Sequence, residues 1–492
     1  MKAGLRPRIT NLNDRTFDDH YLSFESAGAL EFVNEYSGFA VTPAHYIAFA
    51  ELKHARPAAL LYHCGSEIMT AHLDVEFAAF AGIDWSDTKH DICLQAANTR
   101  EREWSVLAHR PAAIDAWACA LRQRFQGRPV AVCLELAKGP LVYALQKYDF
   151  LVLFPVHPAT LAKYREAFAP SHAKADPSDA QFALELLLRY RAKLKPLSPP
   201  SVAMRTLLRL VEQRRRLVGD QSRISNRLTD ALKQYFPDVL AWFPDKDTLL
   251  FCDFLSHWPT LKQLKRARRA TLLSFFHEHH VRSQARIDAR LHAIKSATPL
   301  TDDPAVIGPN QLLVLALVEQ LRATLQAIER FDAEIATVSQ TLPDYSLFRA
   351  LPGAGAILAP RLLVAFGEQR ERYHSAAELQ RYTGIAPVTE SSGKKHWVHW
   401  RLQCPTFLRQ TFVEWAGATI PRSFWAAAYY RQQRDKGCSH QAAVRALAFK
   451  WIRILYRCWQ TRTPYDESTY LNALKRRGSP LLTSIAATAK NT

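Results

Sequence analysis

The stretch Ala78-Ala79-Phe80-Ala81-Gly82-Ile83-Asp84 decides the fold of the first domain. An apolar run of this length is typical of a buried strand, and here it ends in a carboxylate. A short polar turn and a second segment, Asp91-Ile92-Cys93-Leu94-Gln95, follow it. The pattern returns in Pro129-Val130-Ala131-Val132-Cys133-Leu134, which Glu135 follows. We therefore expect Asp84 and Glu135 at the ends of strands.

Residues 77–190 alternate between strand and helix patterns. The sequence predicts strands at 78–84, 90–96, 103–107, 129–135 and 151–156, and helices at 111–125, 139–147, 158–168 and 177–193. Three early strands followed by βα units fit a mixed sheet that is flanked by helices. The segment 195–200, Lys-Pro-Leu-Ser-Pro-Pro, breaks secondary structure and indicates a linker. The predicted fold class is α/β for this domain, followed by mainly α structure.

Two further carboxylates, Asp176 and Asp179, open a long helical pattern. Residues three apart share one face of a helix, so this pair points to one place. Together with Asp84 and Glu135 they suggest a site for two Mg²⁺ ions about 4 Å apart, which need hard oxygen ligands from different elements. Taken singly, each acid has a simpler explanation as a turn or cap residue, and Asp176 before Pro177 is a good helix start. The joint pattern favours the metal site.

The composition points to a polyanionic partner. The chain carries 64 Lys and Arg against 46 Asp and Glu, a net charge of +18. Nucleic acid is the partner that such an excess favours, although a merely soluble basic protein has the same composition. The eight cysteines show no paired spacing, which favours a reducing compartment. Because no signal peptide and no uninterrupted apolar run of membrane-spanning length is visible, we expect a cytoplasmic protein.

The middle of the chain, residues 201–342, is predicted to be a helical coiled-coil region. Residues 201–235 and about 310–342 have apolar residues at helical spacing, which suits an antiparallel pair or a dimerisation arm. Arginines, among them Arg214, Arg215 and Arg216, decorate the first helix, and a basic cluster spans 262–269. This face either binds a phosphate backbone or is simply solvated.

The two ends of the chain look different from the rest. Residues 1–68 carry 6 Lys and Arg against 8 Asp and Glu and show no catalytic pattern. We expect them to be an extension upstream of a natural start at Met69, with a small accessory domain as the alternative. Residues 466–492 are expected to be a tail.

A C-terminal domain is expected over residues 346–465. Leu351-Pro352-Gly353-Ala354-Gly355-Ala356 precedes a helical stretch, and glycines there either expose backbone N–H groups to a phosphate or form a tight turn. Further on, Ser391-Ser392-Gly393-Lys394-Lys395 reads as a polar loop. A serine beside a glycine suits a nucleophile, with Lys394, Lys395 and Arg401 to stabilise developing charge. Most loops of this composition are only turns.

In their order along the chain, these motifs resemble the DEDD transposases of the insertion-sequence one-ten family, the bridge-RNA-guided recombinases. The resemblance covers about residues 77–465. It rests on Gly82-Ile83-Asp84-Trp85, Glu135, the segment 171–180, Leu351–Gly355, Gly384-Ile385-Ala386-Pro387 and Ser391–Lys394.

The resemblance implies a RuvC-like (RNase H fold) domain over residues 77–195 and a C-terminal transposase domain. It implies that Asp84, Glu135, Asp176 and Asp179 bind Mg²⁺ and that Ser392, with Ser391 as the reserve, attacks the scissile phosphate to form a phosphoserine link. The implied partners are donor DNA, target DNA, a guide (bridge) RNA encoded by the element, and further copies of the chain, as a dimer and a tetrameric synaptic complex. Such a protein excises and inserts its element.

One stretch departs from the family pattern, and two other functions stay open. After the serines the family often shows a Lys-x-Gly step, whereas this chain has His399-Trp400-Arg401-Leu402 and keeps only the Leu408-Arg409 pair. The departure puts the local nucleic-acid contacts, including that of Arg409, in question. The first alternative is a RuvC-like Mg²⁺-dependent nuclease of the junction-resolvase type that uses water as nucleophile. The second is a non-catalytic nucleic-acid binder.

Overall fold

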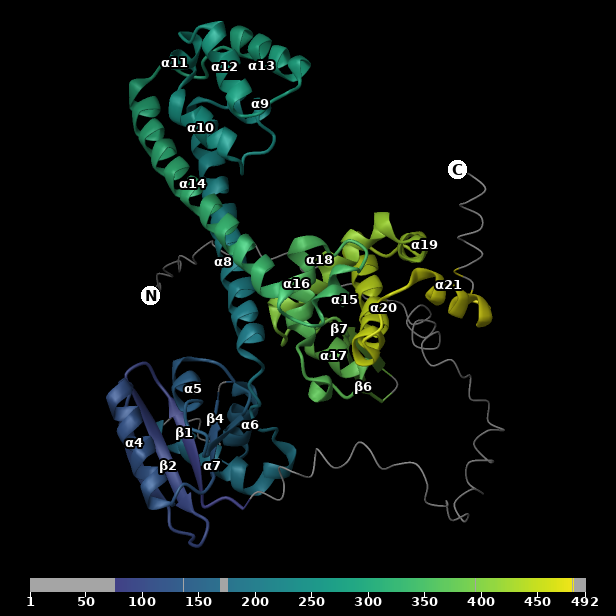
Figure 1. Cartoon of the computed structure of the whole chain (residues 1–492). Coiled ribbons are helices and arrows are strands. Elements are labelled where there is room, and N and C mark those ends of the chain that lie inside the picture. Colours follow the sequence, from purple (N-terminus) through teal and green to yellow (C-terminus); the bar gives the residue numbers. More distant parts are fainter. Residues whose placement is uncertain (1–75, 136, 169–175, 394, 480, 482–492) are drawn as a thin grey trace, which may run out of the picture. The chain divides into compact units, whose positions relative to one another are not determined.

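The structure is a computed structural model and describes residues 76–135, 137–168, 176–393, 395–479 and 481 (Figure 1). The predictions made for residues 1–68, and for residues 480 and 482–492 of the expected tail, lie outside these residues. The chain divides into two compact units, Met1–Leu197 and Ser198–Thr492. Each unit has its own hydrophobic core and is described by itself.

Unit 1 contains a mixed sheet of five strands in the order β3-β2-β1-β4-β5. The first three strands form antiparallel pairs, and β1, β4 and β5 run parallel. The strands are β1 (Ala79–Trp85), β2 (Lys89–Ala96), β3 (Glu103–Ala108), β4 (Val130–Leu134) and β5 (Leu151–Pro155). This confirms the predicted mixed sheet, with every strand within two residues of its predicted bounds.

Helices cover both faces of the sheet because its central strands are apolar on both sides. One face packs on α4 (Pro111–Arg124) and α5 (Pro140–Leu145) through residues such as Val132 and Leu121. The other face packs on α6 (Pro158–Phe168) and α7 (Asp176–Tyr190) through residues such as Cys133 and Leu187. The second face positions the candidate metal site.

Unit 2 is built on two long helices that lie side by side, α8 (Val202–Tyr235) and α14 (Pro304–Gln340). The start of α8 and the end of α14 share one core cluster, and the end of α8 and the start of α14 share another, so the pair is antiparallel. Arg214 of α8 binds the Asp332 carboxylate of α14 through two hydrogen bonds. Helix α14 begins six residues before the predicted start, with Pro304 at its first position, where the N–H that proline lacks would have no intrahelical partner, and with Pro309 inside the helix.

Helix α14 is also long and apolar enough, by length and composition alone, to cross a membrane. The sequence predicted no segment of membrane-spanning length. In the structure Leu317 and Leu321 of this helix are fully buried against the small helices described next. Part of the apolar surface of α14 therefore belongs to a protein core, whereas Leu312 and Leu313 are exposed.

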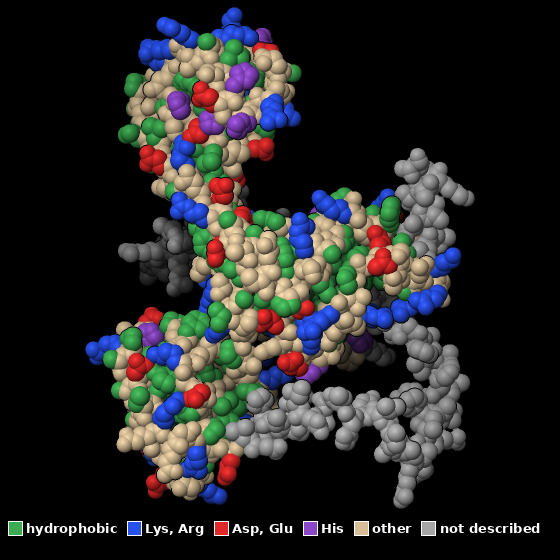
Figure 2. Space-filling model, viewed as in Figure 1, with side chains coloured by type: hydrophobic (Ala, Val, Ile, Leu, Met, Phe, Trp, Pro, Cys, Tyr) green, Lys and Arg blue, Asp and Glu red, His purple; other side chains and the backbone are tan. Residues whose placement is uncertain are grey.

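The segment between α8 and α14 folds into a compact group of short helices, which we call the tip. Its members are α9 (Asp238–Trp242), α10 (Leu249–His257), α11 (Leu261–Lys265), α12 (Arg269–Glu278) and α13 (Gln284–Ser296). In this segment the sequence predicted only the basic cluster 262–269. Its lysines and arginines are exposed, and basic side chains gather at the end of the tip in Figure 2.

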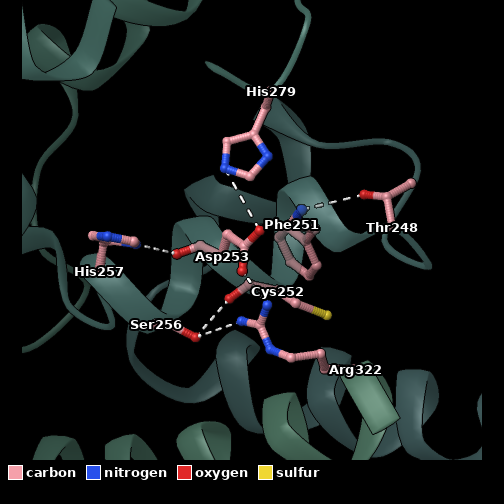
Figure 3. A network of polar contacts seen from close by, with 8 residues as sticks. All are labelled: Thr248, Phe251, Cys252, Asp253, Ser256, His257, His279 and Arg322. Atoms are coloured by element: carbon pink, nitrogen blue, oxygen red, sulfur yellow. Dashed lines mark hydrogen bonds and ion pairs between the residues drawn. The ribbon is translucent and has the colours of Figure 1, made fainter. Parts of the chain in front are cut away.

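A polar network centred on Asp253 fastens the tip to α14 (Figure 3). The Asp253 carboxylate accepts a hydrogen bond from Arg322 of α14 and lies 3.5 Å from Nε2 of His279, which follows α12. Arg322 also donates to the Ser256 hydroxyl at 3.2 Å. One carboxylate thus links α10, the end of α12 and α14. This structural role explains why polar residues occur at this junction.

The rest of unit 2 is a helical domain around an aromatic core. Trp415, Trp425, Trp451 and Trp459 are fully buried in it. The elements are α15 (Tyr345–Arg349), α16 (Gly355–Phe366), α17 (Ala376–Tyr382), α18 (Thr406–Thr419), α19 (Phe424–Asp435), α20 (His440–Thr461) and α21 (Glu467–Arg476), with one hairpin of β6 (Val388–Ser392) and β7 (Lys395–His399).

Candidate active sites

Asp84 and Glu135 lie next to each other at the carboxyl ends of two parallel strands. The register of β1 and β4 pairs Ala79 with Val130 and ends with Ile83 opposite Leu134. Asp84 and Glu135 are the next residues on each strand, and both are half-buried. Carboxyl ends of parallel strands are a common place for ligands in open α/β sheets. The sequence prediction of two acids at strand ends agrees with this placement.

Both acids belong to the face of the sheet that α7 covers. Side chains alternate along a strand, so Glu135 shares its face with Ala131 and Cys133, which pack on Ala183 and Leu187 of α7. Asp84 shares its face with Phe80 and Gly82 for the same reason.

Gly82 brings α7 into direct contact with β1. A Cβ atom at this position would lie 2.1 Å from the Ala180 carbonyl oxygen and 2.4 Å from the Leu184 nitrogen. At the other end of the strand, the Arg191 guanidinium lies over the Phe80 ring. Helix α7 therefore runs antiparallel to β1. Asp84, two residues beyond Gly82, reaches the level of the first turn of α7.

That first turn carries the remaining two acids. Asp176 is the first residue of α7, and its side chain lies outside the part of the chain that the structure describes. Asp179 is buried, with 7% of its side chain exposed, and pairs with Arg165 of α6. Nη1 of Arg165 donates to both carboxylate oxygens, at 2.7 and 2.6 Å. The hydrogen bond that Arg165 donates to Asp179 raises the pKa of Arg165, and the nearby Glu135 carboxylate also raises it.

The donor set at this edge fits a hard divalent cation, since it consists of carboxylates from two strand ends and one helix start. Within the described ranges, no three His, Cys, Asp or Glu side chains are close enough together to hold one ion in common. Arg165 meanwhile supplies positive charge to Asp179. The chemistry of the donors therefore suits Mg²⁺, and Arg165 holds one of them in an ion pair.

Two residues around these acids were not predicted from the sequence. Arg165 gave no signal, because an arginine on an amphipathic helix usually faces solvent. Asp91 is directly opposite Asp84 in the β1–β2 pair and is buried, so both carboxylates lie on the α7 face. Its position at the start of a predicted strand was visible, but its register with Asp84 was not.

The candidate nucleophile lies in unit 2, at the end of a β-hairpin. The prediction of a polar loop for Ser391 and Ser392 is wrong, because both residues belong to strand β6. Ser392 pairs with Lys395 and Ser391 pairs with His396 across the hairpin. Gly393 follows in the turn with φ +58°, a conformation that favours glycine. Both serines are exposed, and Lys394 lies outside the described residues.

Paired residues of a hairpin share one face, so Ser392 shares its face with Lys395, Trp397 and Glu390. The Trp397 side chain is 44% exposed. His399 lies 3.5 Å from the Glu390 carboxylate on the same face. The face around Ser392 therefore offers an ammonium group and an aromatic surface to solvent.

Arg445 of α20, which was not predicted from the sequence either, fixes the base of this hairpin. Its guanidinium donates to the carbonyl oxygens of Gly384 and Ile385, at 2.7 and 3.2 Å, and lies 3.6 Å from the centre of the Trp400 ring. Burial lowers the pKa of Arg445 to about 10, and the neighbouring Arg409 also lowers it. An arginine on the otherwise apolar stripe of α20 was a signal for such a role.

Some of the residues predicted to bind nucleic acid already form hydrogen bonds or ion pairs within the protein, and others are exposed. Arg401 donates to the carbonyl oxygens of Ala386 and Pro387, and Arg409 donates to the carbonyl oxygen of Arg401, all at 3.3 to 3.4 Å. Arg214 is paired with Asp332. Lys395 and the side chains of Arg215 and Arg216 are exposed.

Comparisons with known proteins place the chain in one family. A family model described as "Transposase", for the DEDD transposases of IS110, matches residues 81–237. A second, described as "Transposase IS116/IS110/IS902 family", matches residues 345–431. These two segments contain the described strand-end acids and the serine hairpin.

Individual relatives agree with the family models. The mini-circle putative transposase for IS117 of Streptomyces coelicolor is 28% identical over 414 residues, which are 83% of this chain and 98% of the relative. An uncharacterised 43.6 kDa protein of insertion element IS110, also from Streptomyces coelicolor, is 26% identical over 60% of this chain and 73% of its own length. An uncharacterised 42 kDa protein of insertion element IS900 of Mycobacterium paratuberculosis is 24% identical over 79% and 98%. The chain belongs to the IS110 family of DEDD-type transposases.

Proposed function

We propose that this transposase excises and inserts its insertion sequence by RNA-guided DNA strand exchange, with a metal-binding carboxylate site in unit 1 and a serine nucleophile in unit 2. The observation that carries the proposal is that Asp84 and Glu135 end two neighbouring parallel strands, and that the close approach at Gly82 brings the first turn of α7, which contains Asp179, to the same edge of the sheet. A sheet of this order, with acids at these strand ends, is compatible with a RuvC-like domain.

Asp84, Glu135, Asp176 and Asp179 would hold Mg²⁺. The bound ion would supply Lewis-acid polarisation of the scissile phosphate and stabilise the charge that develops on its oxygens. The chain itself sets up this edge in two ways. Gly82 lets α7 approach β1, which brings the first turn of α7 to the edge of the sheet where the strand acids lie. Arg165 holds the Asp179 carboxylate in a fixed orientation through its two hydrogen bonds.

Ser392 would be the nucleophile. Its Oγ forms a bond to the phosphorus of the scissile phosphodiester, the bond to the leaving sugar oxygen breaks, and the serine proton ends on that oxygen. In the second, rejoining step, a sugar hydroxyl of the exchanged strand attacks the phosphorus of the phosphoserine. The bond from phosphorus to the serine Oγ breaks, and the hydroxyl proton returns to Ser392. One ester replaces another in each step, so strand exchange needs no ATP. Lys395, paired with Ser392 across the hairpin, would stabilise the phosphate charge.

Donor DNA, target DNA and a guide RNA would be the nucleic-acid partners. The net charge of +18 supports binding of several polyanionic strands. The exposed lysines and arginines of the tip add a basic surface outside both candidate sites. The two candidate sites lie in separate units of the chain, and we propose that dimers, and a tetramer in the synaptic complex, combine them.

Metal-dependent cleavage tests the carboxylate site. The full chain, its element-derived RNA, Mg²⁺ and labelled donor DNA are incubated without ATP, and cleavage is followed for Asp84→Asn. Asp87→Asn is the matched control, since Asp87 is exposed in the turn that follows β1. We expect Asp84→Asn to reduce cleavage at least about 100-fold, the scale of losing one preorganised electrostatic group, and Asp87→Asn to cleave normally. Equal cleavage by both variants, or a requirement for ATP, would refute the proposal.

A further inference from the structure

A cavity of about 140 Å³ lies in unit 2 between α8, α14, α16 and α18. One water needs only about 10–15 Å³ by the same kind of measure, so the cavity has room for a larger group. Three arginines line it: Arg214, Arg215 and Arg361. None of the residues proposed for the metal site or the serine hairpin lines it.

The positive charge in this cavity exceeds the negative charge. Arg214 pairs with Asp332 and Arg361 pairs with Glu414, and both acids line the cavity too. Arg215 donates to the neutral side chain of Gln410 at 3.0 Å, so its charge has no matching carboxylate there. Three guanidinium groups against two carboxylates leave one positive charge. A small anion would balance it.

The N–H groups and the positive charge of Arg361 are only partly matched by neighbouring residues. Its Nη2 is buried and has no hydrogen-bond partner among the described residues, although Nε donates to Thr411 at 3.1 Å. Burial lowers the pKa of Arg361, Glu414 opposes that shift, and the nearby Arg214 and Arg215 add to it. A buried, under-hydrogen-bonded guanidinium is costly unless further negative charge approaches it.

The amino terminus of α16 opens onto the same cavity. Ala356 and Ile357, in the first turn of this twelve-residue helix, line it. The N-cap residue Ala354 provides no side-chain hydrogen bond, so the first N–H groups keep the capacity to bind an anion. Gly353 packs tightly on α18, where an added Cβ would lie 2.6 Å from the Ala418 carbonyl oxygen. This contact fixes the helix start beside the arginines.

We infer that this cavity binds one phosphate group of a nucleic-acid backbone. The phosphate oxygens would accept hydrogen bonds from the Arg215 guanidinium and from the backbone N–H groups in the first turn of α16. The buried guanidinium of Arg361 would balance the negative charge of the phosphate. The flat guanidinium groups of Arg215 and Arg361 both lie against Phe407, at 5.3 and 5.1 Å from its ring centre, which holds them in place. This inference deepens the proposed function, because it assigns a backbone contact to the nucleic acid that the transposase handles.

Thermal unfolding of the full chain with inorganic phosphate, against chloride at equal ionic strength, tests occupancy of the cavity. Phosphate should raise the unfolding temperature of the wild type and of Arg453→Gln, since Arg453 is exposed on α20 and does not line the cavity. The rise should disappear in Arg215→Gln. It should also disappear in Ala356→Asp, whose carboxylate at the second helical position favours the helix while occupying the anion's place.

The second arm measures binding of a labelled 40-base-pair duplex and of a single-stranded RNA at several salt concentrations. Arg215→Gln should weaken binding and reduce the slope of log Kd against log salt by about one relative to Arg453→Gln. Identical behaviour of the two variants in both arms would overturn the inference. Loss of the phosphate effect with unchanged nucleic-acid binding would also overturn it, and would make the cavity a site for free phosphate. If the wild type bound no nucleic acid at all, the proposed function itself would fail.

Discussion

Arg165 holds Asp179 through two hydrogen bonds from a single nitrogen, Nη1, at 2.7 and 2.6 Å from the two carboxylate oxygens. The carboxylate is almost completely buried, whereas 26% of the arginine side chain is exposed. A buried carboxylate without a partner destabilises the folded state. The Arg165 guanidinium removes most of this cost at the acidic edge of unit 1 when no metal ion is bound. A metal ion and Arg165 therefore offer the same carboxylate the same kind of compensation.

Replacing Arg165 by alanine should lower the free energy of unfolding by about 1–3 kcal/mol, because a buried charged acceptor loses its donor. Mg²⁺ should restore part of this loss, since it compensates the same carboxylate. Urea unfolding with and without Mg²⁺ measures both effects. Arg122→Ala is the control, because Arg122 pairs with Asp149 at an exposed site and should cost less than about 1 kcal/mol. If Mg²⁺ did not change the unfolding curve of Arg165→Ala, this result would argue against a metal ion beside Asp179.

Gly82→Ala should separate α7 from β1. The added Cβ meets backbone atoms of Ala180 and Leu184, which cannot move independently of the helix. We expect destabilisation of about 3 kcal/mol or more and loss of DNA cleavage. Gly308→Ala provides the comparison, since that helical glycine has open space around it and alanine favours helices. A Gly82→Ala protein that unfolds and cleaves like the wild type would show that close packing of α7 is dispensable.

The fold of unit 1 was predictable because its apolar runs are short, separated by turns, and ended by acids. The positions of Asp84 and Glu135 at strand ends followed directly from that pattern. Their register did not follow, because sequence spacing does not reveal which strands pair. For the same reason Asp91, opposite Asp84, and Arg165, beside Asp179, emerged only from the structure.

The stability of unit 1 should depend on His90. This buried histidine shares a hydrogen bond of 2.9 Å with His109. Burial and then His109 lower its pKa from 6.5 to about 4, while Asp91 opposes the shift. Between these pH values the unfolded chain binds the extra proton, so stability falls as the pH falls from 6.5 towards 4.

Thermal unfolding of wild type and His90→Gln between about pH 7 and 4.5 measures this contribution. The wild type should lose more stability across that window than the variant, because glutamine does not titrate. Parallel pH profiles for the two proteins would show that His90 contributes nothing to acid sensitivity.

Trp397 should contribute to binding of unpaired DNA near Ser392. Its exposed ring lies on the same hairpin face as Ser392 and Lys395, where a base can stack on it. Trp397→Ala should weaken binding of single-stranded DNA by about 1–3 kcal/mol. Quenching of a 2-aminopurine base placed beside the cleavage position should be lost as well. Val398→Ala, on the opposite face of the hairpin, should change neither measurement, and equal effects of the two variants would contradict a stacking role.

Unit 2 was less predictable from the sequence than unit 1. The two long helices were visible from their repeats, but the tip between them was not, because its short helices bury aromatic residues without a long period. The serines were assigned to a loop because Ser, Gly and Lys favour turns. The hairpin that contains them is largely exposed, and buried Arg445 fixes its base through a contact sixty residues away in sequence.

The most direct test of the whole proposal is the detection of a covalent protein–DNA intermediate. The full chain with its RNA, Mg²⁺ and labelled donor DNA is denatured and run on a gel, for the wild type, Ser392→Ala and Ser391→Ala. The proposal predicts a protease-sensitive adduct in the wild type and in Ser391→Ala that is absent in Ser392→Ala. Cleavage without any adduct, at the same rate in both serine variants, would contradict it and would indicate a nuclease that uses water.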